Sequence, residues 1–129
     1  MNYGQYVGIP FVDAGRTKAG CDCWGLVRIV LQEQFGKTLP LWNDYEIASG
    51  DEGEREVELG LREGPFTRVE QPQSGDIALM RIFGKLCHVG LYLGNGEILH
   101  TSRGTDSVIE KIDGMRQLHG KIEGYYRVG

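Results

Sequence analysis

The stretch that most constrains this chain is GCDCWGLVRIVLQEQFG, residues 20–36. Its apolar residues recur every three or four positions, which predicts a helix with one buried face. Asp22 is suited to cap the start of this helix, and Gly36 is suited to end it. Cys23 would then lie in the first turn, where unpaired backbone N–H groups and the helix dipole favour a thiolate. A lone cysteine is more often a small buried apolar residue, so the rest of the chain must decide its role.

Length and composition limit the class of protein. A chain of 129 residues, 40% of them hydrophobic, suits a single domain over residues 1–129. The net charge of -4 argues against nucleic-acid binding, because affinity for phosphates needs clustered Lys and Arg. We expect no membrane span and no export signal, since the sequence lacks the long apolar run or the basic N-terminus that these need. Three cysteines without an export signal predict free thiols rather than disulfides.

The second half of the chain changes from helical patterns to short runs of β-type residues separated by turns. The expected strands are residues 76–82, 87–93, 97–101, 107–111 and 124–128. Before them, residues 51–63 predict a solvent-exposed helix. Helices followed by strands indicate an α+β fold, with N-terminal helices packed on a C-terminal antiparallel sheet of about five strands.

The turn at residues 94–96 determines how two histidines are arranged. A two-residue turn would place His88 and His100 on opposite faces of the sheet. A three-residue loop, Gly94-Asn95-Gly96, would place them on one face as diagonal neighbours, with Gly90 leaving room beside His100. Alternate residues from Cys87 onward would then form an apolar layer on the other face. This pattern favours the three-residue loop.

A cysteine at a helix start and a histidine at a strand start are the parts of a papain-type site. A thiol paired with an imidazole can attack an acyl carbon and return the proton to the leaving amine. Cys23 is therefore the candidate nucleophile and His88 the candidate base. His100 would fix the tautomer and direction of the His88 ring.

A structural zinc site is the alternative from another class of protein. Cys21, Cys23, Cys87, His88 and His100 are all possible ligands. The two cysteines of Cys21-x-Cys23 are closer together than in usual zinc motifs, and consecutive residues of a strand point to opposite faces. We therefore expect no metal and no cofactor.

Four segments, DCWGLV, GDIALMR, HVGLYLGNGEILH and GYYRV, occur in this order. Together they resemble the NlpC-like, papain-type cysteine peptidases of cell-wall turnover, and most of all the phage tail-assembly branch typified by lambda protein K. The resemblance implies a papain-like fold in which Cys23 is the nucleophile, His88 the base and His100 the third, orienting residue. It also implies hydrolysis of amide bonds in peptidoglycan stem peptides.

The sequence departs from this family at two positions near the nucleophile. Trp24 stands where many relatives have Ser, and we expect it to fill space beside Cys23. Phe11 stands where many relatives have a Tyr whose hydroxyl faces the reacting carbonyl. The candidates for binding the oxyanion or substrate are then the Cys23 backbone N–H and Tyr6, together with the neighbouring Phe11, Asp22 and Trp24.

The resemblance to the phage branch also implies partners and a location. The expected partners are peptidoglycan stem peptides and phage tail-tip proteins. The expected location is a virion tail, reached after synthesis in the cytoplasm without a signal peptide. A catalytically inactive relative that serves as a structural or binding part of a tail tip remains the alternative within the same family.

Overall fold

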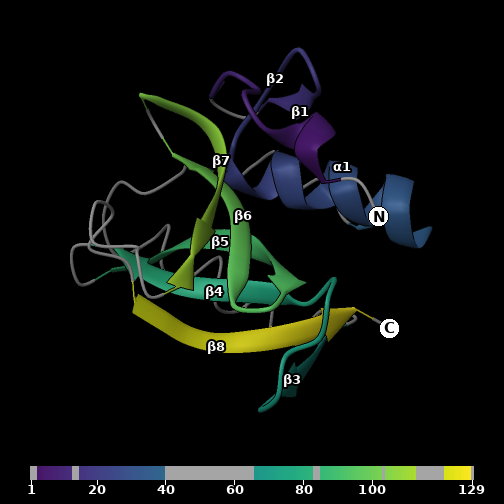
Figure 1. Cartoon of the computed structure of the whole chain (residues 1–129), viewed down its shortest axis with the longest axis vertical. Helices are drawn as coiled ribbons and strands as arrows, with labels where there is room; N and C mark the ends of the chain where they lie inside the picture. Colours follow the sequence, from purple (N-terminus) through teal and green to yellow (C-terminus); the bar gives the residue numbers. More distant parts are fainter. Residues whose placement is uncertain are drawn as a thin grey trace.

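The computed structural model describes residues 3–12, 15–39, 66–82, 85–102, 104–112 and 121–128. The helices are η1 (Gly4–Tyr6, a 3-10 helix) and α1 (Cys23–Phe35). The strands are β1 (Arg16–Thr17), β2 (Gly20–Cys21), β3 (Phe66–Val69), β4 (Ile77–Ile82), β5 (Lys85–Gly94), β6 (Glu97–Ser102), β7 (Thr105–Lys111) and β8 (Lys121–Val128). Strands β1 and β2 form a small hairpin, and the others form an antiparallel sheet in the order β3-β8-β4-β5-β6-β7. Helix α1 lies across one side of this sheet (Figure 1).

The helix predicted around Cys23 is confirmed with both of its ends. The Asp22 carboxylate accepts a hydrogen bond from the Gly25 backbone N–H at 2.7 Å, which satisfies a donor of the first turn. At the other end Gly36 adopts a left-handed conformation with φ 65°, which costs glycine little. The local sequence alone therefore defines where the nucleophile candidate stands.

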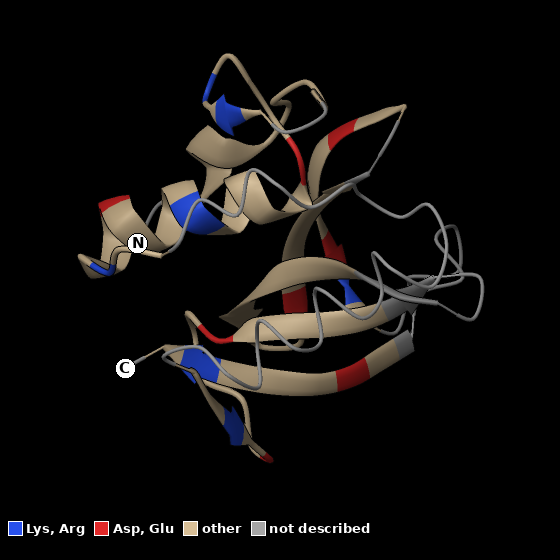
Figure 2. Ribbon diagram, turned by 180° about the vertical axis from the view of Figure 1, so that it is seen from behind, with Lys and Arg blue, Asp and Glu red and all other residues tan. Residues whose placement is uncertain are grey.

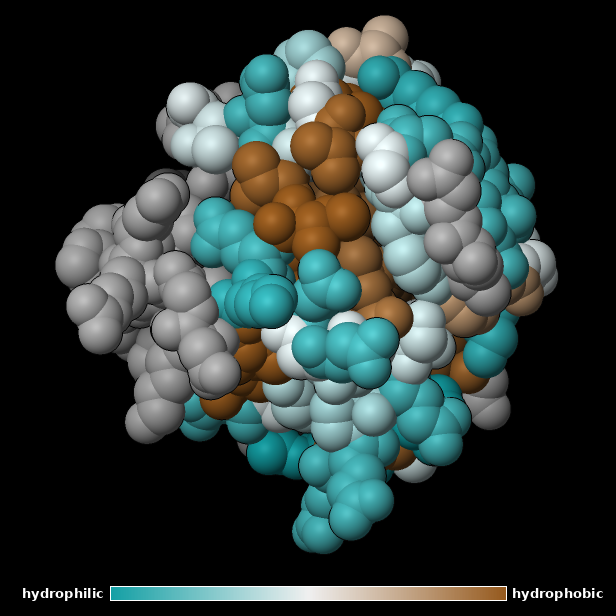
Figure 3. All heavy atoms as spheres, viewed as in Figure 1, coloured by the Kyte–Doolittle hydropathy of each residue, from teal (hydrophilic) through white to brown (hydrophobic). Residues whose placement is uncertain are grey.

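The apolar side of α1 packs against one face of the sheet. The shared cluster includes Leu26, Val27, Val30 and Leu31 of α1 and Leu79, Val89, Leu91 and Leu99 of the sheet. Because side chains alternate along a strand, the cluster of Ala78, Met80 and Ile98 lies on the other face. In the space-filling view, apolar atoms reach the surface over the junction of β6 and α1 (Figure 3).

The α+β class is confirmed, but the strand prediction was incomplete. Within the described residues the main sheet has six strands rather than about five, because β3 was missed. Strands β5, β7 and β8 also begin earlier than predicted. Of the predicted N-terminal helices, α1 is the one α-helix in the described part of the chain, and the predicted helix at residues 51–63 lies outside it.

The predicted three-residue loop is wrong. Gly94 pairs with Glu97, so the turn itself is the two residues Asn95 and Gly96, with φ of 54° and 74°. Positive φ at both positions is typical of a type I′ turn, which matches the twist of the flanking strands. The pairing shifts at Leu93, where β5 carries a bulge, and continues with Tyr92 opposite Ile98.

The bulge restores the arrangement that the sequence predicted for the two histidines. Beyond it Leu91 pairs with Leu99, and continuing this pairing places Gly90 opposite His100. A Cβ at Gly90 would lie 3.1 Å from the His100 Cβ, which confirms that glycine leaves room for this ring. His88 and His100 therefore share a face, although the turn differs from the prediction.

Charged side chains are dispersed over the described elements, and both signs occur on the helix and on the sheet (Figure 2). Across the described ranges, no helix is both long and apolar enough to cross a membrane.

Candidate active site

Two buried histidines from neighbouring strands form the centre of the candidate site. His88 of β5 is 5% exposed and His100 of β6 is 1% exposed. The His88 Nε2 lies 3.1 Å from the His100 Nδ1, with the two rings inclined at 78°. One of these nitrogens must therefore carry the proton of a buried hydrogen bond, and the other must accept it.

Burial keeps both rings neutral at neutral pH. Desolvation, followed by the neighbouring His100, lowers the pKa of His88 to about 3. Desolvation lowers the pKa of His100 to about 4. An imidazole pair of this kind is available to accept a proton, rather than being charged before the reaction begins.

Cys23 is the first residue of α1 and is 4% exposed. Helix α1 packs against β5 and β6, and Cys23 belongs to the same apolar cluster as Val89, whose side chain points to the opposite face of β5 from that of His88. Helix α1 and strand β5 run in the same direction across the molecule (Figure 1), so the start of the helix and the start of the strand lie toward the same end. The thiol thus stands at the amino end of a capped helix, and that helix packs against the strand that carries His88.

Asp22 holds this helix end to the β1–β2 hairpin. Besides capping α1, its Oδ1 atom accepts a hydrogen bond from the Arg16 guanidinium at 2.8 Å. The Asp22 carboxylate is fully buried, so the ion pair is shielded from water. Nothing in the sequence pattern predicted the contribution of Arg16, because the pairing depends on the turn of the hairpin.

The two residues that depart from the family pattern lie close to the helix start. Phe11 forms a bridge with Cys21 of β2, two residues before the nucleophile candidate. Trp24 is buried and packs edge-on against Phe66 of β3, with ring centroids 6.2 Å apart. Phe11 therefore offers no hydroxyl at this place, and Trp24 links the helix start to the edge of the sheet.

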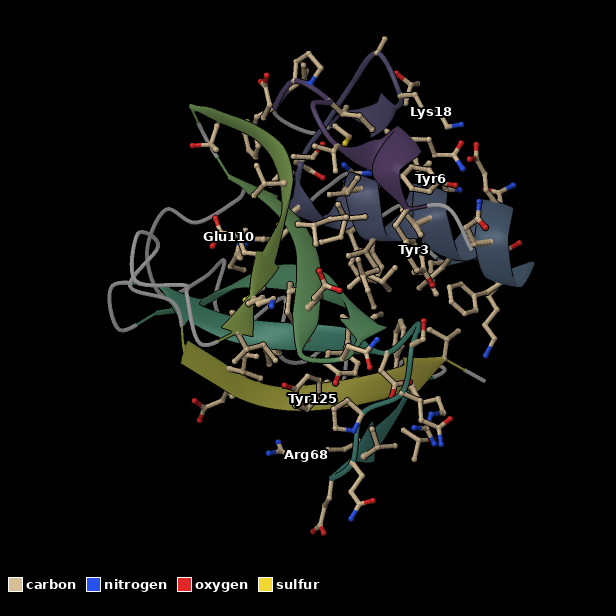
Figure 4. All side chains as sticks on the ribbon, viewed as in Figure 1. Tyr3, Tyr6, Lys18, Arg68, Glu110 and Tyr125 are labelled. Carbon is tan, nitrogen blue, oxygen red and sulfur yellow. The ribbon has the colours of Figure 1, made fainter. Side chains whose placement is uncertain are left out.

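The assignment of Tyr6 as an oxyanion donor is wrong. Its hydroxyl donates to the Glu33 carboxylate at 2.8 Å and accepts from the Gln34 amide at 2.9 Å. Glu33 is ten residues after Cys23, about 15 Å along the helix axis. Figure 4 shows Tyr6 and Lys18 beside α1, well away from Glu110 on β7. Tyr6 therefore fastens η1 to the far part of α1.

A carboxylate that the sequence patterns left unassigned lies close to His100. Glu110 of β7 lies 3.9 Å from the His100 Nε2, a contact that only the strand register reveals.

Among the described residues, no group of three or more His, Cys, Asp or Glu side chains is placed to hold a metal ion. The Cys87 side chain, predicted to face the apolar layer, is outside the described part.

Comparison with known proteins places the chain in a family. A sequence model of the NlpC/P60 family matches residues 8–122. The chain belongs to the NlpC/P60 family. It is 31% identical over 111 residues to the Murein DD-endopeptidase MepS/Murein LD-carboxypeptidase of Escherichia coli (strain K12). This match covers 86% of the chain and 52% of the relative, so the chain spans about half the length of that relative.

Other relatives are similar to the chain in sequence, and solved structures are similar to it in fold. The chain is 29% identical over 100 residues to the Gamma-DL-glutamyl hydrolase of Bacillus subtilis (strain 168), covering 77% of the chain and 21% of the relative. Its fold resembles the NlpC/p60 domain of peptidoglycan hydrolase SagA, with a TM-score of 0.60, 22% identity and coverage of 98% and 91%. An NlpC/P60 family protein from Bacillus cereus ATCC 10987 gives a TM-score of 0.65 at 24% identity, with coverage of 95% and 36%.

Brief treatment with iodoacetamide near neutral pH is expected to alkylate Cys23 before the other thiols. Burial, and then the Asp22 carboxylate, raise the pKa of Cys21 to about 11, although Arg16 lowers it in part. Cys21 is thus a neutral, inert thiol, whereas the first turn of α1 favours a thiolate at Cys23. Peptide mapping by mass spectrometry measures the order of labelling. First labelling of Cys21 or Cys87 would contradict this expectation.

The two histidines are expected to make the fold sensitive to acid. In the unfolded chain they bind protons near their ordinary pKa of 6.5, whereas in the fold burial lowers the pKa to about 3 and about 4. The unfolded state therefore binds more protons between these values, and the free energy of unfolding falls as the pH drops below about 6.5. Urea unfolding across this range measures the slope. In the His88→Asn/His100→Asn variant the slope should be shallower, and an unchanged slope would refute the explanation.

Proposed function

We propose that this chain is a cysteine peptidase that hydrolyses amide bonds in peptidoglycan stem peptides. Cys23 is the nucleophile, His88 the base and His100 the residue that orients the base. The observation that carries the proposal is the buried hydrogen bond between the two imidazoles, which come from the two strands against which the helix that begins with Cys23 packs. The similarity to a murein DD-endopeptidase and to a gamma-DL-glutamyl hydrolase supports the substrate class.

The histidine contact indicates which nitrogen serves as the base. The His88 Nε2 is occupied by its contact with the His100 Nδ1. If Nε2 carries the proton and donates it to His100, the Nδ1 of His88 keeps a free lone pair. That lone pair takes the thiol proton of Cys23 as the sulfur attacks the acyl carbon. His100 stabilises the resulting imidazolium by accepting from it.

The reaction then proceeds in two steps, acylation of the thiol and hydrolysis of the thioester. Sulfur attack forms a tetrahedral intermediate, and the imidazolium gives its proton to the leaving amine as the C–N bond breaks. Water, deprotonated by His88, then attacks the thioester and releases the acid and the thiol. The oxyanion of each intermediate would lie near the Cys23 backbone N–H at the start of α1, with no hydroxyl supplied by Phe11.

Mass spectrometry of products from defined stem peptides tests this function. Under reducing conditions the protein should cleave an amide bond of the peptide and leave the sugar bonds of muropeptides intact. Release of disaccharides with intact stems would contradict the assignment. A folded protein that cleaves none of the defined stem peptides would instead favour an inactive structural role. The lack of a hydroxyl at Phe11 would contribute to that inactivity.

The pairing of Cys23 with His88 has its own test. If His88 is the base, the dependence of Cys23 alkylation on pH must change when His88 is replaced by asparagine. The His88→Asn variant keeps a polar side chain of moderate size. An identical pH dependence of alkylation in the wild-type protein and in the variant would show that His88 does not act on the Cys23 thiol.

We further propose that the protein works in a phage tail, in contact with tail-tip proteins, and meets the cell wall during infection. This proposal rests on the resemblance of segments such as DCWGLV to the phage tail-assembly branch. Peptides of this chain should be found by mass spectrometry in purified tails from particles induced in the source strain. Their absence from tails, together with their presence in the cell lysate, would contradict it.

A further inference from the structure

Three polar side chains form a row across three adjacent strands. His88 of β5 contacts His100 of β6 through Nε2 and Nδ1, 3.1 Å apart. On the far side of the same ring, the His100 Nε2 lies 3.9 Å from the Oε2 of Glu110 in β7. The Glu110 side chain is 22% exposed, so one end of the row reaches toward solvent.

Within the described part of the chain, the two facing atoms of this second contact are both unsatisfied. The His100 Nε2 and the Glu110 Oε2 are buried and have no hydrogen-bond partner among the described residues. Buried polar atoms are nearly always paired, so two unpaired atoms of complementary kind at this separation call for an explanation. A small rotation of the glutamate side chain would convert the contact into a hydrogen bond.

The strand register holds these groups together. Ile98 pairs with Glu110, and His100 pairs with Val108. Glu110 is therefore the diagonal neighbour of His100 on one face of the sheet, within reach of a long side chain. His88 and His100 have the same diagonal relation across β5 and β6. The same geometric step thus occurs twice along the row.

We propose that Glu110 is a positioning residue, whose carboxylate accepts the Nε2–H of His100 and so fixes the tautomer of that ring. With its proton on Nε2, His100 presents a bare Nδ1 and accepts the Nε2–H of His88. His88 in turn presents its bare Nδ1 toward Cys23, a last step that rests on the function proposed above. Without the carboxylate, His100 can carry its proton on Nδ1 and donate it to the His88 Nε2. His88 would then carry its own proton on Nδ1 instead of Nε2.

The contact is between a carboxylate and a neutral ring rather than between two ions. Desolvation lowers the pKa of His100 to about 4, so near neutral pH the ring carries one proton. A carboxylate can only accept, and it therefore selects the tautomer that donates from Nε2. When His88 gains a proton during the reaction, the negative charge of Glu110 also favours the cation through the intervening ring.

Long-range ¹H–¹⁵N correlation spectra of the histidine-labelled protein test this directly. Near neutral pH the wild-type protein should show His100 protonated on Nε2 and His88 protonated on Nε2. In the Glu110→Gln variant, which keeps the shape and removes the charge, the His100 signals should move toward the other tautomer. The control Glu123→Gln, an exposed carboxylate on β8, should leave both signals unchanged. Wild-type His100 protonated on Nδ1 would overturn the proposal without any variant.

Turnover of a stem peptide supplies the second readout. In Glu110→Gln, kcat should fall about tenfold, a part of the roughly 10²- to 10⁴-fold that general acid–base catalysis contributes, with KM unchanged. Unchanged tautomers and an unchanged kcat in Glu110→Gln would overturn the positioning role while leaving the proposed function intact. A tautomer shift in a protein that cleaves no peptide would support the role of Glu110 and count against the proposed function alone.

Discussion

Replacing Cys23 with alanine is expected to abolish amide hydrolysis and to leave the fold intact. The variant removes the one atom that forms the covalent intermediate, so kcat/KM should fall roughly 10⁴- to 10⁶-fold. Cys23 is buried at the first position of α1, where alanine is a good helix former, so the free energy of unfolding should change by about 1 kcal/mol or less. Peptide turnover and urea unfolding of the same preparations measure both quantities.

The matched control is Cys21→Ala, which removes a neighbouring buried thiol and should keep nearly full turnover. His88→Ala should lose about as much as Cys23→Ala, because nucleophile and base act as one unit. For the same reason, the double variant should be no slower than either single variant. Turnover by Cys23→Ala above the level of the double variant would show that another group attacks the substrate.

Replacing Gly90 with alanine is expected to disable the site although every proposed reacting side chain remains. The new Cβ would lie 2.8 Å from the Ile98 Cγ2 and 3.1 Å from the His100 Cβ, so β5 and β6 or the His100 ring must shift. A displacement near 1 Å costs about 10²-fold in rate, so kcat should fall by that order. The free energy of unfolding should fall by about 1–3 kcal/mol, as for other overpacked sites.

A second glycine of the sheet provides the control for this variant. A Cβ at Gly124 of β8 would meet the guanidinium of Arg68, the flexible end of a long side chain, at 3.0 Å. Gly124→Ala should therefore lose little turnover. The histidine NMR signals should move in Gly90→Ala and stay in Gly124→Ala. Wild-type kcat in a folded Gly90→Ala protein would show that the spacing around His100 is not required.

The parts of the site that the sequence predicted are those whose signals lie close together in the chain. The cap at Asp22, the glycine at Gly36 and the apolar spacing between them define α1 without help from other elements. Room for His100 beside Gly90 was also predictable, because alternation along two strands joined by a short turn is a local property.

The parts that escaped prediction depend on partners far away in sequence. Strand β3 has four residues and pairs with β8 at the sheet edge, from Phe66 with Val128 onward, so no neighbouring segment indicates it. Tyr6 was misassigned because its hydrogen bonds reach Glu33 and Gln34, which only folding brings near. Glu110 faces His100 through a register that the sequence leaves open.

The bulge in β5 gives the hairpin a tolerance for changes in length. The last regular pair before the turn is Tyr92 with Ile98, and residues 93–97 connect these two residues. The connection consists of one closing pair, a two-residue turn and the surplus residue Leu93. A chain one residue shorter can close the same hairpin without the bulge, and Gly90 would still stand opposite His100. Insertion or deletion of this single residue among related sequences can therefore occur at the turn without disturbing the histidines.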